Sequence, residues 1–183
     1  QDVQVMIEGP GHVPLNEVTA NVTLAKSLIG DVPYYVLGPL VTDIASGHDH
    51  IASAIGAAVS ASAGVDLLCY LTPSEHLALP NPEEVKEGLI AYRIAAHAGD
   101  LVKIREKAIK WDLKMTEARR TLDWETQLAL SIDPEKAAKI HARTGQHPGN
   151  NVPCTMCGGA CVYLMLPQQR SYVKENENLK QVG

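Results

Sequence analysis

The chain has 183 residues, of which 45% are hydrophobic, and a formal net charge of −5 at pH 7. Since a typical domain has about 150 residues, this length predicts one domain with an appendage. The acidic balance argues weakly against nucleic acid as a partner, and no apolar stretch is long enough to span a membrane. The first residues also lack the basic and apolar regions of a signal peptide. We therefore expect a soluble, cytoplasmic protein that binds neither nucleic acid nor membrane.

The first 99 residues predict three consecutive strand–loop–helix units. Each unit pairs a short apolar run with a segment of helical periodicity. The predicted strands are Val3–Ile7, Tyr34–Leu40 and Val65–Leu71, and the predicted helices are Asn16–Ile29, Ile51–Ala63 and Pro82 to about His97. Gly99 is expected to interrupt or end the last helix. This order predicts parallel strands with helical crossovers. Three such units cannot close a barrel of eight, so either the remaining units are absent or the three strands form a small open sheet. Because the chain starts with Gln and its first strand begins by Val3, we expect a piece of a longer protein.

Polar residues follow each predicted strand, at the end where parallel sheets place their chemistry. They are Glu8 and His12 after the first strand, Asp43, His48, Asp49 and His50 after the second, and Glu75 and His76 after the third.

From Asp100 to Arg143 the pattern is helical and contains no strand. Its apolar stripe is typical of helix packing and comprises Leu101, Ile104, Ala108, Trp111 and Met115. Asp133 and Pro134 predict a capped helix start. The loop from Thr144 to Pro153 then leads to a group of cysteines.

Three of the four cysteines, Cys154, Cys157 and Cys161, lie within eight residues. A disulfide is not expected, because nothing indicates secretion. An iron–sulfur cluster normally takes four cysteines, so three would leave one iron open to a small molecule. The alternative is a zinc ion completed by a histidine such as His147. The fourth cysteine, Cys69, lies in an apolar run and is predicted to be in the core.

Five segments resemble the C-terminal part of the phosphomethylpyrimidine synthase (ThiC) family. In the same order along the chain they are residues 6–14, 35–45, 50–58, 69–80 and 154–158, and the resemblance extends to about Met165. The paralogous 5-hydroxybenzimidazole synthases share these motifs.

The resemblance implies an α/β fold, namely the C-terminal part of a (β/α)8 barrel followed by a helical region and a Cys-rich cluster-binding segment. The implied divisions are 1–99 for the last three strand–helix units, 100–143 for the helical region and 144–183 for a flexible cluster segment and tail. Family members form homodimers in which the cluster segment of one subunit reaches the active site of the other.

The implied activity is that of a radical S-adenosylmethionine enzyme, a carbon–carbon lyase with a [4Fe-4S] cluster. Such an enzyme converts 5-aminoimidazole ribotide to 4-amino-5-hydroxymethyl-2-methylpyrimidine phosphate in thiamine biosynthesis, with electrons from a donor such as flavodoxin or ferredoxin. The alternatives are a 5-hydroxybenzimidazole synthase of anaerobic cobamide biosynthesis, which uses the same substrate, and a non-enzymatic Cys-rich metal-binding module.

The resemblance also implies roles for seven residues, and none of these roles is directly catalytic. The cluster ligands are Cys154, Cys157 and Cys161, the ligands of a divalent zinc or iron ion are His12 and His76, and the substrate-binding residues are Glu8 and Tyr35. One feature departs from the family pattern, because three residues, not four, separate Cys157 from Cys161.

Overall fold

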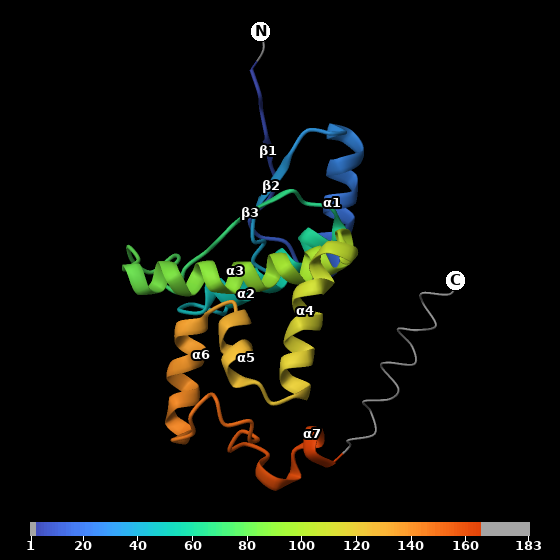
Figure 1. Ribbon diagram of the computed structural model, residues 1–183. Helices are drawn as coiled ribbons and strands as arrows, with labels where there is room; N and C mark the ends of the chain where they lie inside the picture. Colours follow the sequence, from blue (N-terminus) through green and yellow to red (C-terminus); the bar gives the residue numbers. More distant parts are fainter. Residues whose placement is uncertain (1–2, 166–183) are drawn as a thin grey trace, which may run out of the picture. The chain divides into compact units, whose positions relative to one another are not determined.

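The computed structural model describes residues 3–165. The chain divides into two compact units, Gln1–Lys110 and Trp111–Gly183, which we describe separately. The first unit contains β1 (Ile7–Glu8), α1 (Leu15–Ile29), β2 (Tyr34–Leu37), α2 (Asp49–Ala63), β3 (Leu67–Cys69) and α3 (Pro82–Lys103) (Figure 1). This order confirms the three predicted strand–helix units and the α/β class.

The three strands form a parallel sheet in the order β1-β2-β3. In its register Glu8 pairs with Tyr35, and Tyr35 pairs with Leu67. Parallel neighbours joined by helices need the crossover connections that α1 and α2 supply.

All three strands are shorter than predicted. The residues Val3, Val5 and Met6 are 72%, 62% and 58% exposed and precede β1, since pairing with β2 begins only at Ile7. The second strand stops at Leu37 because Gly38 has φ +86°, a conformation that an extended strand does not use. An apolar run therefore predicts too long a strand when the neighbouring strand that it pairs with is short.

The third helix runs through Gly99 to Lys103, so the prediction of an interruption there was wrong. A Cβ on Gly99 would lie 2.3 Å from the Cβ of Ala61, and the glycine therefore permits close packing of α3 on α2. The predicted start is confirmed by a capping box. The side chain of Asn81 accepts from the Glu84 N–H at 2.9 Å, and the Glu84 carboxylate accepts from the Asn81 N–H at 2.8 Å.

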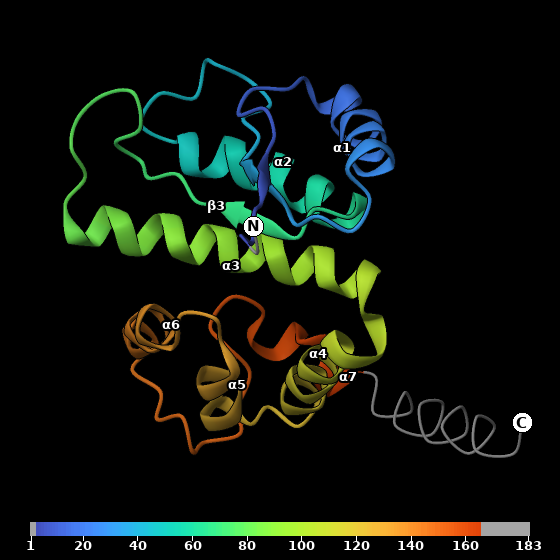
Figure 2. The ribbon, with the colours of Figure 1, turned by 90° about the horizontal axis from the view of Figure 1, so that it is seen from above.

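Two apolar clusters hold the first unit together. One joins α1 to the sheet through Val22, Tyr34, Val36 and Val65. The other joins α2 and α3, which lie side by side (Figure 2), to the segments that follow β2 and β3. Its buried members are Leu40, Ala52, Ala57, Leu71, Tyr92 and Ala95.

Side chains alternate across the sheet, and this separates packing residues from exposed ones. Tyr34 and Val36 are buried on the helix side. The register places Glu8, Tyr35 and Leu67 together on the opposite face, where Glu8 and Leu67 are exposed. We call this second face the open face.

The second unit, as far as it is described, contains helices and turns. Helix α4 (Arg105–Arg120) begins in the first unit and continues into the second, and it is followed by α5 (Trp124–Leu130), α6 (Pro134–His141), η1 (Ala142–Thr144), η2 (Gly158–Ala160) and α7 (Val162–Met165). The predicted start of α6 is confirmed, since the Asp133 carboxylate accepts from the Lys136 N–H at 3.1 Å. The predicted tail lies mostly in 166–183, outside the described residues.

No helix among residues 3–165 combines the length and the apolar character needed to cross a bilayer.

Candidate functional site

His12 and His76 lie close together, although they follow different strands. Their ring centroids are 5.7 Å apart with planes tilted by 49°. His12 forms a parallel bridge with Leu40 just beyond β1 and β2, and His76 lies in the turn after β3. The parallel sheet therefore brings both imidazoles to its carboxyl end, as the sequence predicts.

Each of these histidines is oriented by a carboxylate. The Nδ1 atom of His12 lies 2.9 Å from Oδ1 of Asp43, and Nδ1 of His76 lies 2.9 Å from Oδ2 of Asp49. A carboxylate bonded to Nδ1 favours the tautomer that carries its proton there, so Nε2 keeps a free lone pair.

Of the two carboxylates, Asp49 orients its histidine more firmly. It is only 4% exposed, in the first turn of α2, whereas Asp43 is exposed in the loop before that helix. The hydrogen bond that Nδ1 of His76 donates to Asp49 raises the pKa of His76, and the charges of Asp49, Glu75 and Asp43 raise it further. Asp49 is therefore the residue that orients His76, and Glu75 contributes only its charge.

The backbone of His76 is in the left-handed region, with φ +62°. A residue other than glycine rarely adopts this conformation, and such strain is concentrated at functional sites.

The two imidazoles suit a shared divalent cation. Two rings that bind one zinc through nitrogen at 2.0–2.1 Å have centroids roughly 5–6 Å apart, and the observed separation is 5.7 Å. Among residues 3–165, no group of three or more His, Cys, Asp or Glu side chains is arranged to hold a metal ion. Two protein ligands would leave the remaining positions on the ion to other molecules.

His48 and His50 serve the helix rather than this pair. His48 is the N-cap residue of α2, and its carbonyl accepts from the N–H groups of Ile51 and Ala52. His50 is 4% exposed, with Nε2 3.7 Å from Oε1 of Glu87.

Glu8, Tyr35 and Cys69 form a second cluster on the open face. A hydrogen bond with Cys69, burial, and the negative charges of Cys69 and Glu8 together raise the pKa of Tyr35 to about 12. Cys69 is only half-buried, so the prediction that it lies in the core was wrong. Side-chain alternation could have corrected this, because it places Cys69 on the same face of β3 as Leu67, which pairs with Tyr35.

The cysteine segment lies in the second unit and is attached to its helices. The indole Nε1 of Trp124 donates to the Val152 carbonyl at 2.8 Å, and Nε2 of Gln146 donates to the Pro153 carbonyl at 3.3 Å. These bonds hold the chain directly before the first cysteine.

The three thiols have different surroundings. Cys154 is half-buried, Cys157 exposed and Cys161 buried. The backbone N–H groups of Cys157 and Met156 and the thiol of Cys157 lower the pKa of Cys154, which favours its thiolate. The turn η2 separates Cys157 from Cys161. The three thiols suit an iron–sulfur cluster. Among the described residues they are not assembled as a group of metal ligands, so the segment would have to close around a cluster to bind it.

His147, the predicted alternative zinc ligand, bonds within its own turn. Its Nδ1 accepts from the Gly149 N–H at 3.0 Å, and the side chain is exposed.

Comparisons with known proteins support the resemblance seen in the sequence. The Radical SAM ThiC family profile matches residues 1–168. A phosphomethylpyrimidine synthase from Ignicoccus hospitalis is 56% identical over 177 residues, which are 97% of this chain and 39% of that protein. Enzymes of the same name from Desulfitobacterium hafniense and Sulfolobus acidocaldarius are 58% and 57% identical, over 90% and 91% of this chain and 38% and 39% of their own lengths.

The chain thus spans about two fifths of the length of these relatives. Both the family profile and the relatives cover nearly all of the chain. The chain belongs to the Radical SAM ThiC family.

Proposed function

We propose that this chain forms part of a radical S-adenosylmethionine enzyme that converts 5-aminoimidazole ribotide to the pyrimidine phosphate of thiamine biosynthesis. The observation that carries the proposal is the pair His12 and His76, with each Nδ1 bonded to a carboxylate, at the carboxyl end of a parallel sheet. The names of the relatives favour this activity over hydroxybenzimidazole synthesis.

The sheet fits the last three units of a (β/α)8 barrel. Parallel sheets are normally covered on both faces, whereas Glu8 and Leu67 on the open face are exposed. In a closed barrel this face would line the interior, and the remaining strands would come from the rest of the protein. On this proposal 1–99 is barrel, 100–143 a helical region and 144–183 the cluster segment.

In the mononuclear site, His12 and His76 would hold a zinc or iron ion through their Nε2 atoms. Asp43 and Asp49 keep the Nδ1 protons in place and so keep these lone pairs free. When bound, such an ion supplies a positive charge that can hold an anionic or polar group of the substrate.

Glu8 and Tyr35 would bind the substrate from the open face. With a pKa of about 12, Tyr35 stays protonated at neutral pH and can donate a hydrogen bond. The exposed Glu8 carboxylate can accept hydrogen bonds from ribose hydroxyls or an amine. The pair therefore offers one donor and one acceptor side by side.

Cys154, Cys157 and Cys161 would hold the [4Fe-4S] cluster, and the lowered pKa of Cys154 favours the thiolate that such a site needs. When bound, the cluster supplies the electron that cleaves S-adenosylmethionine and starts the radical rearrangement. A homodimer and a flavodoxin- or ferredoxin-like donor complete the proposal.

A product assay with the complete protein tests the proposal. With reductant and S-adenosylmethionine, the wild type should form the pyrimidine phosphate, and His76→Ala should lose both product and one divalent ion while retaining its cluster iron. His147→Ala is the matched control and should retain product and metal. Formation of hydroxybenzimidazole by the wild type, or full activity of His76→Ala, would reject the assignment.

A further inference from the structure

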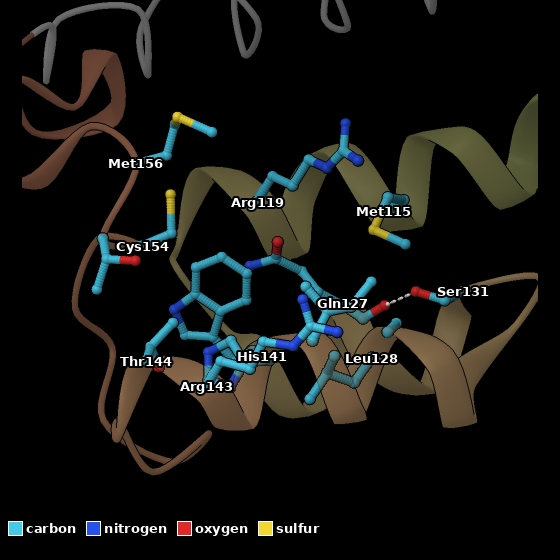
Figure 3. Close-up of a pocket in the computed structure, with 14 residues that line it drawn as sticks. Met115, Arg119, Gln127, Leu128, Ser131, His141, Arg143, Thr144, Cys154 and Met156 are labelled. Carbon is cyan, nitrogen blue, oxygen red and sulfur yellow. Dashed lines mark hydrogen bonds between the residues drawn. The ribbon is translucent and has the colours of Figure 1, made fainter.

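The second unit contains a pocket of about 510 Å³ between α4, α5, α6 and the cysteine segment (Figure 3). This volume lies within the range of small-molecule sites, about 300–1,000 Å³. Its apolar walls include Met115, Leu128 and Ile140, and Cys154 forms part of another wall. A ligand here would contact the helices and the cysteine segment together.

The charge around the pocket is positive. Its lining contains Arg119 and Arg143 and no Asp or Glu. Both arginines are exposed, so their charge lies at the rim. Figure 3 shows Arg143 extending toward Gln127 and Leu128, whereas the guanidinium of Arg119 points away from them. This arrangement favours a ligand with an anionic group at the mouth of the pocket, near Arg143.

One ring nitrogen of a buried histidine in the lining makes no hydrogen bond within the described residues. His141 is 7% exposed, and within residues 3–165 its Nε2 atom has no hydrogen-bond partner. Leaving a buried polar nitrogen unpaired is costly, so a polar group of a ligand would be favoured beside it.

An indole lies beside this histidine. The ring centroids of Trp124 and His141 are 4.7 Å apart with planes tilted by 41°. Because the indole Nε1 is already bonded to the Val152 carbonyl, what Trp124 can offer a ligand is its ring surface. Planar apolar groups bind such surfaces well.

From these features we propose that the pocket binds a small planar organic anion. Its ring would pack against Trp124, its acidic group would face Arg143, and a polar edge would meet Nε2 of His141. This proposal is independent of the activity proposed above, because it concerns binding to the chain without a cluster.

The test uses 6-hydroxy-2-naphthoate, whose hydroxyl supplies the polar edge, and its neutral counterpart 6-hydroxy-2-naphthamide as probes of the full 183-residue chain. Binding is followed by the NMR resonance of the Trp124 indole N–H. The Trp111 indole, whose Nε1 donates to the Leu130 carbonyl at 2.7 Å, provides the internal reference. We expect saturable shifts at Trp124 and an affinity about fivefold higher for the naphthoate, as suits one exposed charge contact.

Three variants decide the outcome. Arg143→Gln should reduce the preference for the anion, whereas Lys139→Gln, the same charge change on α6 outside the lining, should not. His141→Phe keeps a ring beside Trp124 and should weaken both probes. Failure of either probe to bind, equal affinity for the two, or an effect of Lys139→Gln as large as that of Arg143→Gln would overturn the proposal.

Discussion

At the level of single residues, the most informative contacts are those between histidines and carboxylates. The Nδ1 atoms of His12 and His76 are both bonded to aspartates at 2.9 Å, but only Asp49 is buried. A buried carboxylate is held in one position and orients its imidazole more firmly than an exposed one. Asp49 should therefore matter more for metal affinity than Asp43.

We predict that Asp49→Asn in the complete protein weakens binding of the divalent ion about ten- to hundredfold, as is typical when an orienting partner is lost. Competition with a chromophoric chelator measures this affinity. Asp43→Asn should have a smaller effect, and Asp31→Asn, in the turn before β2, should have none. Equal affinities for Asp49→Asn and the wild type would show that Asp49 does not support a metal ligand.

The sequence predicted the histidine pair but not its hydrogen bonds. His12 and His76 could be found because each follows a predicted strand, and parallel strands end at a common edge. Several acidic residues follow the same strands, and spacing alone could not show that Asp49 reaches His76 while Glu75 does not. Cys69 was assigned to the core because its neighbours are apolar, although alternation places it on the face of the sheet that carries Tyr35.

At the level of elements, glycines allow the helices of the first unit to pack closely. A Cβ on Gly88 of α3 would lie 2.2 Å from the Leu71 carbonyl oxygen, and one on Gly56 of α2 would lie 2.0 Å from the Pro39 carbonyl oxygen. Both neighbours are backbone atoms that cannot rotate away.

Gly88→Ala should therefore destabilise the fold by about 2 kcal/mol, the usual cost of overpacking, despite the better helix propensity of alanine. The matched control is Gly159→Ala, since a Cβ there meets no atom within 4 Å. Urea denaturation of the metal-free chain measures both. A Gly88→Ala variant as stable as the wild type would show that α3 can shift away from the segment after β3.

Asp66 ties α1 to the sheet and should make stability depend on pH. Its carboxylate accepts from Nζ of Lys26 at 2.8 Å and from the Tyr34 N–H at 2.9 Å. Burial alone would raise the pKa of Asp66, but these two hydrogen bonds and the charges of Lys26 and Lys103 lower it overall.

A lowered carboxyl pKa in the folded state adds stability above the unfolded pKa, and this is lost as the pH falls through the folded value. The difference in free energy of unfolding between the wild type and Asp66→Asn should thus have its full size at pH 7 and should decrease below about pH 4. Urea titrations at several pH values measure it, with Lys26→Met as a companion that removes the cation. A difference that does not change with pH would exclude this carboxylate as the cause.

Element order was more predictable than element length. Caps and turns mark helix starts in the sequence, so the starts of α3 at Pro82 and of α6 at Pro134 were predicted correctly. Strand ends depend on the neighbouring strand, which a single apolar run does not reveal, and β1 therefore pairs over only Ile7–Glu8. Gly99 was read as a breaker because its packing partner, Ala61, is distant in sequence.

For the whole molecule, the exposed residues of the open face bear on how the chain behaves in solution. They span about two fifths of the relatives, and Leu67 and Val5 are 43% and 62% exposed. Exposed apolar groups and strand edges favour association.

We expect the 183-residue chain alone to form no pyrimidine product and to self-associate, as judged by a turnover assay with a reconstituted cluster and by light scattering. The complete protein, prepared in the same way, serves as the positive control. A monodisperse monomer of this chain that makes the product would contradict the proposed incomplete barrel.

The most direct test of the central claim is the metal content of the anaerobically reconstituted chain. If Cys154, Cys157 and Cys161 bind the cluster of a radical enzyme, the chain should take up about four iron and four sulfide. Its visible and electron paramagnetic resonance spectra should change when S-adenosylmethionine is added. Each single Cys→Ser substitution at these positions should abolish this uptake, whereas Cys69→Ser should preserve it. Uptake of one zinc ion without sulfide, lost in His147→Ala, would instead identify a metal-binding module.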